Sequence, residues 1–356
     1  MRIVQLTPAF SVGDAVGENA VALCKYFRKQ GLDSWIESPD IKTPHPWVKK
    51  LDIAGLKGLD ERDVVIYHVA VATPYAQVFL GLRAKKVIIS HNVTPPEFYS
   101  PYSPSIAELL KKTLDEIKFF VENKDRIELF VGVSDYNSSM LKEMGAEAVT
   151  VPLVIDWSRF EGEESPYLKE IFRDDKKNFL FVGRVVPNKK IEDLIKFVFY
   201  YKEMVSPAVR LIIAGNKNAL PKYTFALYDL AFRFHLSDDE VVFTGWIEDD
   251  ELRSLYRVAD LFVSASEHEG FGVPFVEAFY FGVPVLAYRA AAVPETVGDA
   301  GLLLETKRPD IWGEAANIIL TNKNLREELI NKGKKRVNEL RSLQPERKLF
   351  ELITSL

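Results

Sequence analysis

The sequence predicts an α/β protein in which two doubly wound parallel sheets form two domains. Short apolar runs alternate with amphipathic stretches of helical spacing along the chain, which is typical of parallel α/β architecture. A length of 356 residues exceeds one ordinary core and suits two. Hydrophobic residues make up 47% of the chain and charged residues 27%, which is a globular composition. No apolar run is long enough to span a bilayer.

Each half of the chain supplies six candidate strands, which are short apolar runs ending at polar or glycine-containing turns. In the first half they lie at 3–6, 34–37, 64–67, 87–90, 129–133 and 148–151. In the second half they lie at 179–182, 210–214, 241–244, 261–264, 285–288 and 301–304. Residues 152–178 carry prolines, acidic pairs and weak periodicity, so they form the connection. We place the boundary near residue 165, with domains at 1–165 and 166–344.

Charge and cysteine content exclude several classes of function. The formal net charge of −5 argues against a general nucleic-acid binder, whose affinity comes from clustered Lys and Arg. Cys24 is the single cysteine, so neither an internal disulfide nor a cysteine metal cluster is expected. The apolar run at 3–6 is too short for a signal peptide and suits a first strand. We therefore expect a cytoplasmic protein.

Open parallel sheets bind ligands at the carboxyl ends of their strands, so the residues after each strand carry the functional prediction. Gly13 and Gly17 follow the first strand and permit a close backbone approach, although a tight turn explains them equally well. They do not form the G-x-G-x-x-G fingerprint, which disfavours hydride transfer. His91 follows the fourth strand, where a neutral ring can donate a hydrogen bond or orient a sugar hydroxyl. His68 follows the third strand, and we favour His91.

The strand at 179–182 is followed by a glycine and then by cations. Gly183 permits a close approach, and Arg184 and Lys189 precede the helix expected at 191–201. Two such cations beside a helix N-terminus can hold a diphosphate and stabilise its charge as it leaves. A solvated basic loop is the competing interpretation of this segment taken alone.

Another glycine turn follows the strand at 241–244. Its exposed backbone, at Trp246 and Ile247, can read the edge of a nucleobase, and the Trp246 ring can pack against the base. A core position is the alternative for Trp246, because buried aromatic residues are common.

The segment at 266–277 predicts an anion site. Its glycines bring backbone N–H groups close to a ligand, and Pro274 suits the start of a helix whose N-terminus attracts a phosphate. The turn contains Gly270, Phe271, Gly272 and Val273. Glu269 and Glu277 lie eight residues apart around this turn and can accept hydrogen bonds from sugar hydroxyls. The combination predicts a sugar nucleotide as the ligand.

Other chemistries lack residues to support them. The sequence has no P-loop, no G-x-S-x-G elbow, no Asp-x-Asp pair after a strand and no His or Cys set with metal-ligand spacing. Arg184, Lys189 and helix N-termini would then meet the charge on a leaving diphosphate. We expect no metal ligands, no cofactor and a metal-independent reaction.

Taken together, these segments resemble the family 4 retaining glycosyltransferases of GT-B fold, which have two Rossmann-like domains facing a central cleft. The resemblance covers nearly the whole chain. Residues 183–189 are similar to the diphosphate-binding Arg and Lys of that family, and residues 269–277 to its E-x7-E motif. The Gly-Asp-Ala at 13–15 and the Ser-His-Asn-Val-Thr-Pro-Pro at 90–96 resemble bacterial and archaeal mannosyl- or other hexosyltransferases of surface polysaccharides.

The resemblance implies a role for each matched residue. Arg184 and Lys189 would neutralise the diphosphate, Glu277 would hold the ribose hydroxyls, and Glu269 would hold the donor sugar. His91 would lie beside the reacting carbon. In this family the acceptor attacks on the face from which the diphosphate leaves, so catalysis is mainly electrostatic and positional. The C-terminal helix of the family returns to the first domain, which implies that residues 345–356 pack there.

The implied activity is a retaining transfer of a mannose- or glucose-type hexose from GDP-hexose or UDP-hexose to a glycan or lipid-linked acceptor. A GT-B sugar-nucleotide epimerase, a glycoside phosphorylase and a catalytically silent nucleotide-sugar-binding subunit remain as alternatives. Peripheral contact with the inner face of the membrane is a hypothesis motivated by the basic cluster at 83–86, by aromatic residues at 194–204 and by the acceptors common in the family. For those aromatic residues a core position is the alternative.

Overall fold

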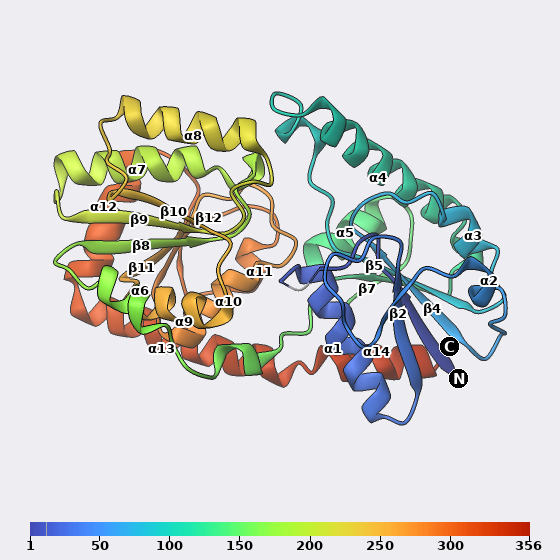
Figure 1. Cartoon of the computed structure of the whole chain (residues 1–356). Coiled ribbons are helices and arrows are strands. Elements are labelled where there is room, and N and C mark those ends of the chain that lie inside the picture. The colour runs from blue at the N-terminus through green and yellow to red at the C-terminus, as the bar shows by residue number, and fades with distance from the viewer. Residues whose placement is uncertain (12) are drawn as a thin grey trace. The chain divides into compact units, whose positions relative to one another are not determined.

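The computed structural model describes residues 1–11 and 13–356, and it divides the chain into two compact units. The N-terminal unit comprises Met1–Asp156 together with Leu343–Leu356, and the C-terminal unit comprises Trp157–Ser342. Each unit contains a parallel sheet with helices packed on it (Figure 1). The predicted α/β class with two doubly wound parallel sheets is confirmed.

In the described part of the N-terminal unit, the sheet has seven strands in the order β3-β2-β1-β4-β5-β6-β7. Neighbouring strands are parallel throughout. The central strand β4 is buried at every position, as expected for a sheet covered on both faces. The strands are β1 (Arg2–Leu6), β2 (Asp33–Ser38), β3 (Val48–Lys50), β4 (Val64–Val69), β5 (Lys85–Ser90), β6 (Leu129–Gly132) and β7 (Ala148–Thr150).

The short edge strand β3 was not predicted. Val48 is partly buried and Lys49 and Lys50 are exposed, so the segment lacks the apolar run by which the other strands were found. Lysines on a short edge strand also discourage pairing with another chain. All twelve predicted strands are present in the two units, with ends shifted by no more than two residues.

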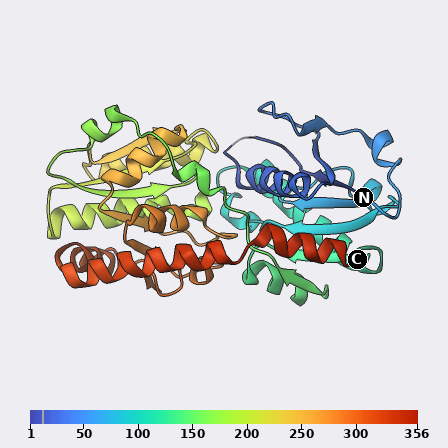
Figure 2. The same cartoon turned by 90° about the horizontal axis from the view of Figure 1, so that it is seen from below.

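Helices of the N-terminal unit include one from the far end of the chain. Asp14 caps α1 by accepting a hydrogen bond from the Gly17 N–H. The ring of Phe350 in α14 packs on Tyr26 and Phe27 of α1, with centroids 6.0 and 6.4 Å apart (α14 is the last red helix in Figure 2). The helices are α1 (Ala15–Lys29), α2 (Ile53–Leu56), α3 (Ala76–Leu80), α4 (Pro104–Glu122), α5 (Asp135–Glu143) and α14 (Pro345–Thr354).

The described C-terminal unit has a six-stranded parallel sheet in the order β10-β9-β8-β11-β12-β13. Helices α7 and α8 lie on one side of this sheet and α9 and α10 on the other (Figure 1). The strands are β8 (Lys177–Val182), β9 (Val209–Ala214), β10 (Val241–Gly245), β11 (Leu261–Ser264), β12 (Val285–Tyr288) and β13 (Leu302–Leu304). The helices are α6 (Pro166–Ile171), α7 (Ile191–Met204), α8 (Pro221–Arg233), α9 (Asp249–Val258), α10 (Val273–Phe281), α11 (Val293–Val297), α12 (Pro309–Thr321) and α13 (Lys323–Ser342).

The division between the units falls at residue 156, nine residues before the position expected from the sequence. Residues 157–165 belong to the C-terminal unit because α9 binds them. Arg253 donates to the backbone carbonyls of Arg159 (2.8 Å) and Glu163 (2.9 Å), and Arg159 forms an ion pair with Asp249 at 2.7 Å. These contacts join segments about 90 positions apart, which no local pattern could predict.

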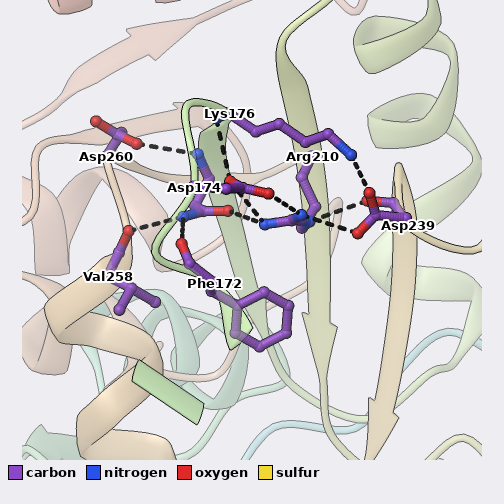
Figure 3. A network of polar contacts seen from close by, with 8 residues as sticks. Phe172, Asp174, Lys176, Arg210, Asp239, Val258 and Asp260 are labelled. Carbon is purple, nitrogen blue, oxygen red and sulfur yellow. Dashed lines mark hydrogen bonds and ion pairs between the residues drawn. The ribbon is translucent and has the colours of Figure 1, made fainter. Parts of the chain in front are cut away.

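An ion network around a buried arginine closes the amino end of the C-terminal sheet (Figure 3). Arg210, at the start of β9, is only 2% exposed. Its guanidinium donates to Asp174 (2.6 Å), to Asp239 (2.8 Å) and to the side-chain oxygen of Asn178 (3.1 Å), and lies over the ring of Phe172. Two carboxylates therefore match the charge of Arg210. This network lies at the amino edge of the sheet, whereas ligands of such sheets bind at the carboxyl edge.

No helix in the described part of the chain is both long and apolar enough to cross a membrane.

Candidate functional site

Three glycines line the carboxyl edge of the C-terminal sheet. Gly183, Gly215 and Gly245 follow the neighbouring strands β8 and β9 and end β10. Their backbones are joined laterally, since the Gly183 N–H donates to Ala214 and the Gly215 N–H donates to Gly245, each at 2.9 Å. A Cβ at Gly215 would lie 2.1 Å from the Gly183 carbonyl oxygen. This edge therefore presents bare backbone, which lets a ligand approach closely.

The cations after β8 differ in their partners. Lys189 Nζ lies 2.5 Å from Glu269 Oε1, and both side chains are mostly buried. Lys190 Nζ lies 3.5 Å from Glu267. Arg184 is exposed and makes no hydrogen bond or ion pair with any residue that the structure describes. Of these three cations, Arg184 is the one whose charge the protein leaves unmatched.

A buried asparagine ties this loop to the predicted anion site. The side-chain amide of Asn188 donates to the His268 carbonyl (3.0 Å). The backbone carbonyl of Asn188 accepts from the Glu267 N–H (2.9 Å) and from the Ser266 hydroxyl (3.3 Å). These bonds bring residues 187–189 against residues 266–269, so Lys189 and Glu269 meet although they are 80 positions apart. The sequence predicted both residues but not their ion pair.

Helix α10 begins at this anion site. Gly272 precedes it with φ of +94°, and a Cβ there would lie 2.6 Å from the Phe275 ring, so only glycine fits without rearrangement. No described side chain caps this helix end, which leaves backbone donors for a ligand. The partial positive charge of the helix end adds to that of Arg184 in favouring an anion.

Glu277 lies within the first turns of α10 and is 5% exposed. Its Oε2 accepts a 2.7 Å hydrogen bond from the Tyr256 hydroxyl, which belongs to α9. Burial raises the pKa of Glu277, and the bond from Tyr256 partly opposes that rise. No described residue bonds to Oε1, so one carboxylate oxygen is fixed and the other is left for a ligand.

The other residues that the sequence predicted to bind the sugar nucleotide differ in their exposure to solvent. Trp246 is 61% exposed, so its ring lies outside the core, and Ile247 is partly buried. Phe271 is 4% exposed and its carbonyl accepts a hydrogen bond from Thr296, so its N–H is the group left for a ligand. The turn residues Gly270 and Val273 are partly buried.

Two of the predicted residues of the N-terminal unit lie near the start of α1. Gly17 is buried, and a Cβ there would lie 2.8 Å from the Ser11 carbonyl oxygen. Gly13 is exposed, and its N–H donates to Glu18 Oε1 at 2.8 Å. Close packing of the turn therefore accounts for Gly17, while the N–H of Gly13 is already used by the protein. Val12, between them, lies outside the described residues.

His91, after β5, is held by a buried neighbour. Its Nε2 lies 2.7 Å from Nδ1 of His68, and the two rings stack with centroids 5.0 Å apart. His68 Nε2 lies 3.0 Å from Gln5 Oε1, and the Gln5 amide donates to the Ala20 carbonyl at 2.8 Å. Burial lowers the pKa of His68 well below its usual range and that of His91 to about 3, so both rings are neutral at neutral pH.

The residues that hold the site side chains in place were not predicted from the sequence. Gly215 could have been predicted from the sequence as a site residue, because it directly follows the strand at 210–214. The sequence favours His91 over His68, and Tyr256 and Asn188 belong to no pattern that marks a site. The described residues contain no group of three His, Cys, Asp or Glu side chains that could hold a metal ion.

Known proteins match the chain in sequence and in fold. Residues 168–336 match the family model described as Glycosyl transferases group 1. An uncharacterized glycosyltransferase of Methanocaldococcus jannaschii is 32% identical over 169 residues, covering 47% of this chain and 42% of that protein. The O-antigen chain mannosyltransferase B of Escherichia coli is 27% identical over 274 residues, covering 66% of this chain and 69% of that protein. The chain thus spans less than half the length of the archaeal relative.

A solved structure extends the likeness to the whole chain. Anabaena HepE, crystallised in complex with UDP and glucose, superposes with a TM-score of 0.77 and covers 100% of both chains. The sequence identity is 17%, so this match bears on the fold.

Proposed function

The chain belongs to a GT-B glycosyltransferase family, and from this premise we propose that it is a retaining hexosyltransferase. The proposed donor is GDP-hexose or UDP-hexose with a mannose- or glucose-type sugar, and the proposed acceptor is a glycan or a lipid-linked glycan. Two relatives support this choice, since the E. coli relative is named a mannosyltransferase and the Anabaena protein was crystallised with UDP and glucose.

The observation that carries the proposal is the unmatched charge of Arg184 on an edge of bare glycine backbone. A diphosphate suits this edge, because a guanidinium recognises two phosphate oxygens at once and the α10 N-terminus offers further donors. Lys189 retains donors beyond its bond to Glu269 and would contact the same group. We assign the ribose to Glu277 and the base to the turn at Trp246 and Ile247.

The proposed reaction breaks the bond between the anomeric carbon and the diphosphate oxygen. The electron pair leaves with the nucleoside diphosphate, and Arg184, Lys189 and the helix N-terminus stabilise the added charge. The acceptor oxygen bonds to the same carbon on the face that the diphosphate leaves, which retains the configuration, and the proton of the acceptor hydroxyl passes to the departing diphosphate. Glu269 would orient the transferred sugar while fixing Lys189, and His91 would contact a sugar hydroxyl at the carboxyl edge of the N-terminal sheet. Since these cations balance the charge, we propose that the reaction is metal-independent.

Ligand-dependent unfolding tests the donor site. GDP, UDP, ADP and their hexose conjugates should be compared, since a ligand at about 100 times its Kd adds roughly 2.7 kcal/mol to the unfolding free energy. We expect stabilisation by one base and retention of that effect in EDTA. If none of these nucleotides stabilises the protein, it has no donor site of the proposed kind.

Turnover separates transfer from the alternatives. Release of the nucleoside diphosphate, with the hexose recovered on an acceptor in the same anomeric configuration, is expected. Inversion at the anomeric carbon, or phosphorolysis without any nucleotide, would contradict the proposal. Loss of transfer in EDTA that returns with a divalent cation would contradict metal independence.

Contact with a membrane surface is proposed on different residues from those that first suggested it. In the basic cluster at 83–86, Lys86 is buried and donates to the Ala84 carbonyl. In α7, Phe197 and Tyr201 belong to the core. Two strongly exposed aromatic residues are instead Phe225 (74%) and Phe232 (78%) of α8, which lie seven positions apart on one helix face.

Co-sedimentation with anionic liposomes at low salt tests this contact. We expect the protein to pellet with the vesicles and the Phe225→Ser/Phe232→Ser variant to remain in solution. If both proteins pellet with the vesicles, α8 does not make the membrane contact. If neither protein pellets, the protein does not bind the membrane surface.

A further inference from the structure

A line of polar side chains crosses the N-terminal sheet from the buried Gln5 and His68 to the partly buried His91. Gln5 lies on β1, His68 on β4, and His91 follows β5, and these strands are neighbours. Gln5 pairs with Ile66 and His68 pairs with Ile89 in the strand register. Because side chains alternate between faces, the three polar residues lie on the same face of the sheet. The line starts at Ala20 of α1, whose carbonyl bonds to Gln5.

The Ala20 carbonyl fixes the orientation of the Gln5 amide. A carbonyl oxygen can only accept a hydrogen bond, so the NH2 group of Gln5 must face it at 2.8 Å. The amide oxygen therefore faces His68 Nε2, at 3.0 Å. Because that oxygen also only accepts, Nε2 of His68 must carry a hydrogen and donate it.

The same reasoning passes to His91. A neutral imidazole has one N–H and one lone pair, so Nδ1 of His68 is an acceptor. Nε2 of His91, at 2.7 Å, must then be the donor. Nδ1 of His91 is left with a lone pair, and no described residue bonds to it. Neutrality of both rings follows from their burial, which lowers both pKa values.

We propose that Gln5 and His68 are positioning residues that hold His91 in its Nε2–H tautomer, so that Nδ1 accepts a hydrogen bond from a hydroxyl of a sugar bound at this edge of the N-terminal sheet. The identity of the ligand as a sugar rests on the proposed function, whereas the tautomer does not. In this state His91 cannot donate to a phosphate oxygen. The ring therefore selects a group that offers a hydrogen, such as an alcohol, and contributes nothing to anion binding.

Long-range proton–nitrogen NMR of the full chain, labelled with 15N-histidine, reads the tautomer directly. We expect the His91 signals to show a protonated Nε2 and an unprotonated Nδ1 at neutral pH without any ligand. A protonated Nδ1 on His91 would overturn the proposal. This measurement needs no variant and no activity.

The Gln5→Leu variant tests the role of the line. Without the amide oxygen, nothing fixes the tautomer of His68, so we expect His91 to populate both tautomers. Ser90→Ala is the matched control, because Ser90 is buried next to His91 and its hydroxyl has no partner. An unchanged His91 tautomer in Gln5→Leu, with the fold intact by thermal unfolding, would show that the line does not position the ring.

Kinetics connect the tautomer to transfer. Loss of one hydrogen bond to the sugar should slow transfer by Gln5→Leu about tenfold, with the affinity for the free nucleotide unchanged. A variant whose tautomer changes while transfer stays at the wild-type rate would refute the contact with the sugar. If the wild type transfers no sugar, the proposed function fails while the tautomer assignment stands.

Discussion

The two edges of the C-terminal sheet use arginine in opposite ways. At the amino edge, Arg210 is buried and its guanidinium bonds to Asp174, Asp239 and Asn178 (Figure 3). At the carboxyl edge, Arg184 is exposed and bonds to no described residue. A buried cation needs partners, because desolvation without them costs several kcal/mol. A cation without partners is more available to an anionic ligand, because a partner would compete with the ligand. Charge matching therefore distinguishes the edge that Arg210 closes from the edge where we propose the donor site.

The largest effect is expected from Arg184→Ala. Removal of one preorganised donor to a developing charge typically costs about 10²–10³-fold in rate. The unfolding temperature should stay the same, because Arg184 makes no contact that the fold needs. Arg184→Lys is the control and should recover part of the rate, since it restores the charge without the bidentate geometry. Transfer at the wild-type rate in Arg184→Ala would break the comparison.

Arg210→Met should give the reverse result at the other edge. Loss of the guanidinium leaves Asp174 without its ion-pair partner and the buried Asn178 oxygen without this donor, whereas Asp239 keeps its ion pair with Lys176. We therefore expect about 2 kcal/mol of lost unfolding free energy. Denaturant unfolding measures this. Nucleotide affinity at low temperature should be unchanged in the folded fraction, and a selective loss of affinity would show that the edges are coupled.

Gly215→Ala tests the bare backbone. Its φ of +145° and its approach to the Gly183 carbonyl oblige the edge to move, at a cost of roughly 1–3 kcal/mol with weakened nucleotide binding. Gly31→Ala is the matched control, with φ of +81° and nothing within 4 Å of the added carbon. It should lower stability alone. Equal nucleotide affinity in the two variants would mean that the edge does not contact the donor.

The smallest effect is expected from Tyr256→Phe, as a change in pH dependence. In the proposed donor site Glu277 binds the ribose in its charged form, so donor binding should be lost as the pH falls through the raised pKa of Glu277. Tyr256 stabilises that charged form, so its loss raises the pKa further and moves the midpoint of binding to higher pH. We expect a shift of about one pH unit or less, since one hydrogen bond is worth about 1 kcal/mol. A shift to lower pH in a nucleotide titration would be inconsistent with the assigned bond.

Strands were predictable because their signal is local. Buried parallel strands are continuous apolar runs, and every one that the sequence indicated is present. The edge strand β3 was missed because a half-exposed Val-Lys-Lys segment has no such run. Glycines and cations after strands could likewise be found, because the carboxyl edge of a parallel sheet is a defined place in any such fold.

Partners of the site residues could not be predicted. The bond from Tyr256 to Glu277 joins two helices, and nothing in the sequence of α9 distinguishes this tyrosine from a core residue. The role of His68 depends on strand order, since β4 lies between β1 and β5 and brings Gln5 and His91 to opposite sides of one ring. Such contacts follow from tertiary packing, which a local pattern does not encode.

The return of α14 to the N-terminal unit has a consequence for how the protein is made. Phe350 packs on Tyr26 and Phe27 of α1. Because Phe350 is synthesised after the whole C-terminal unit, these two aromatic residues lack this contact until synthesis of the chain is almost finished. Domains tend to fold as they are synthesised, and the C-terminal unit, which is continuous in sequence, can do so. The unit that is synthesised first is therefore the one that is completed last.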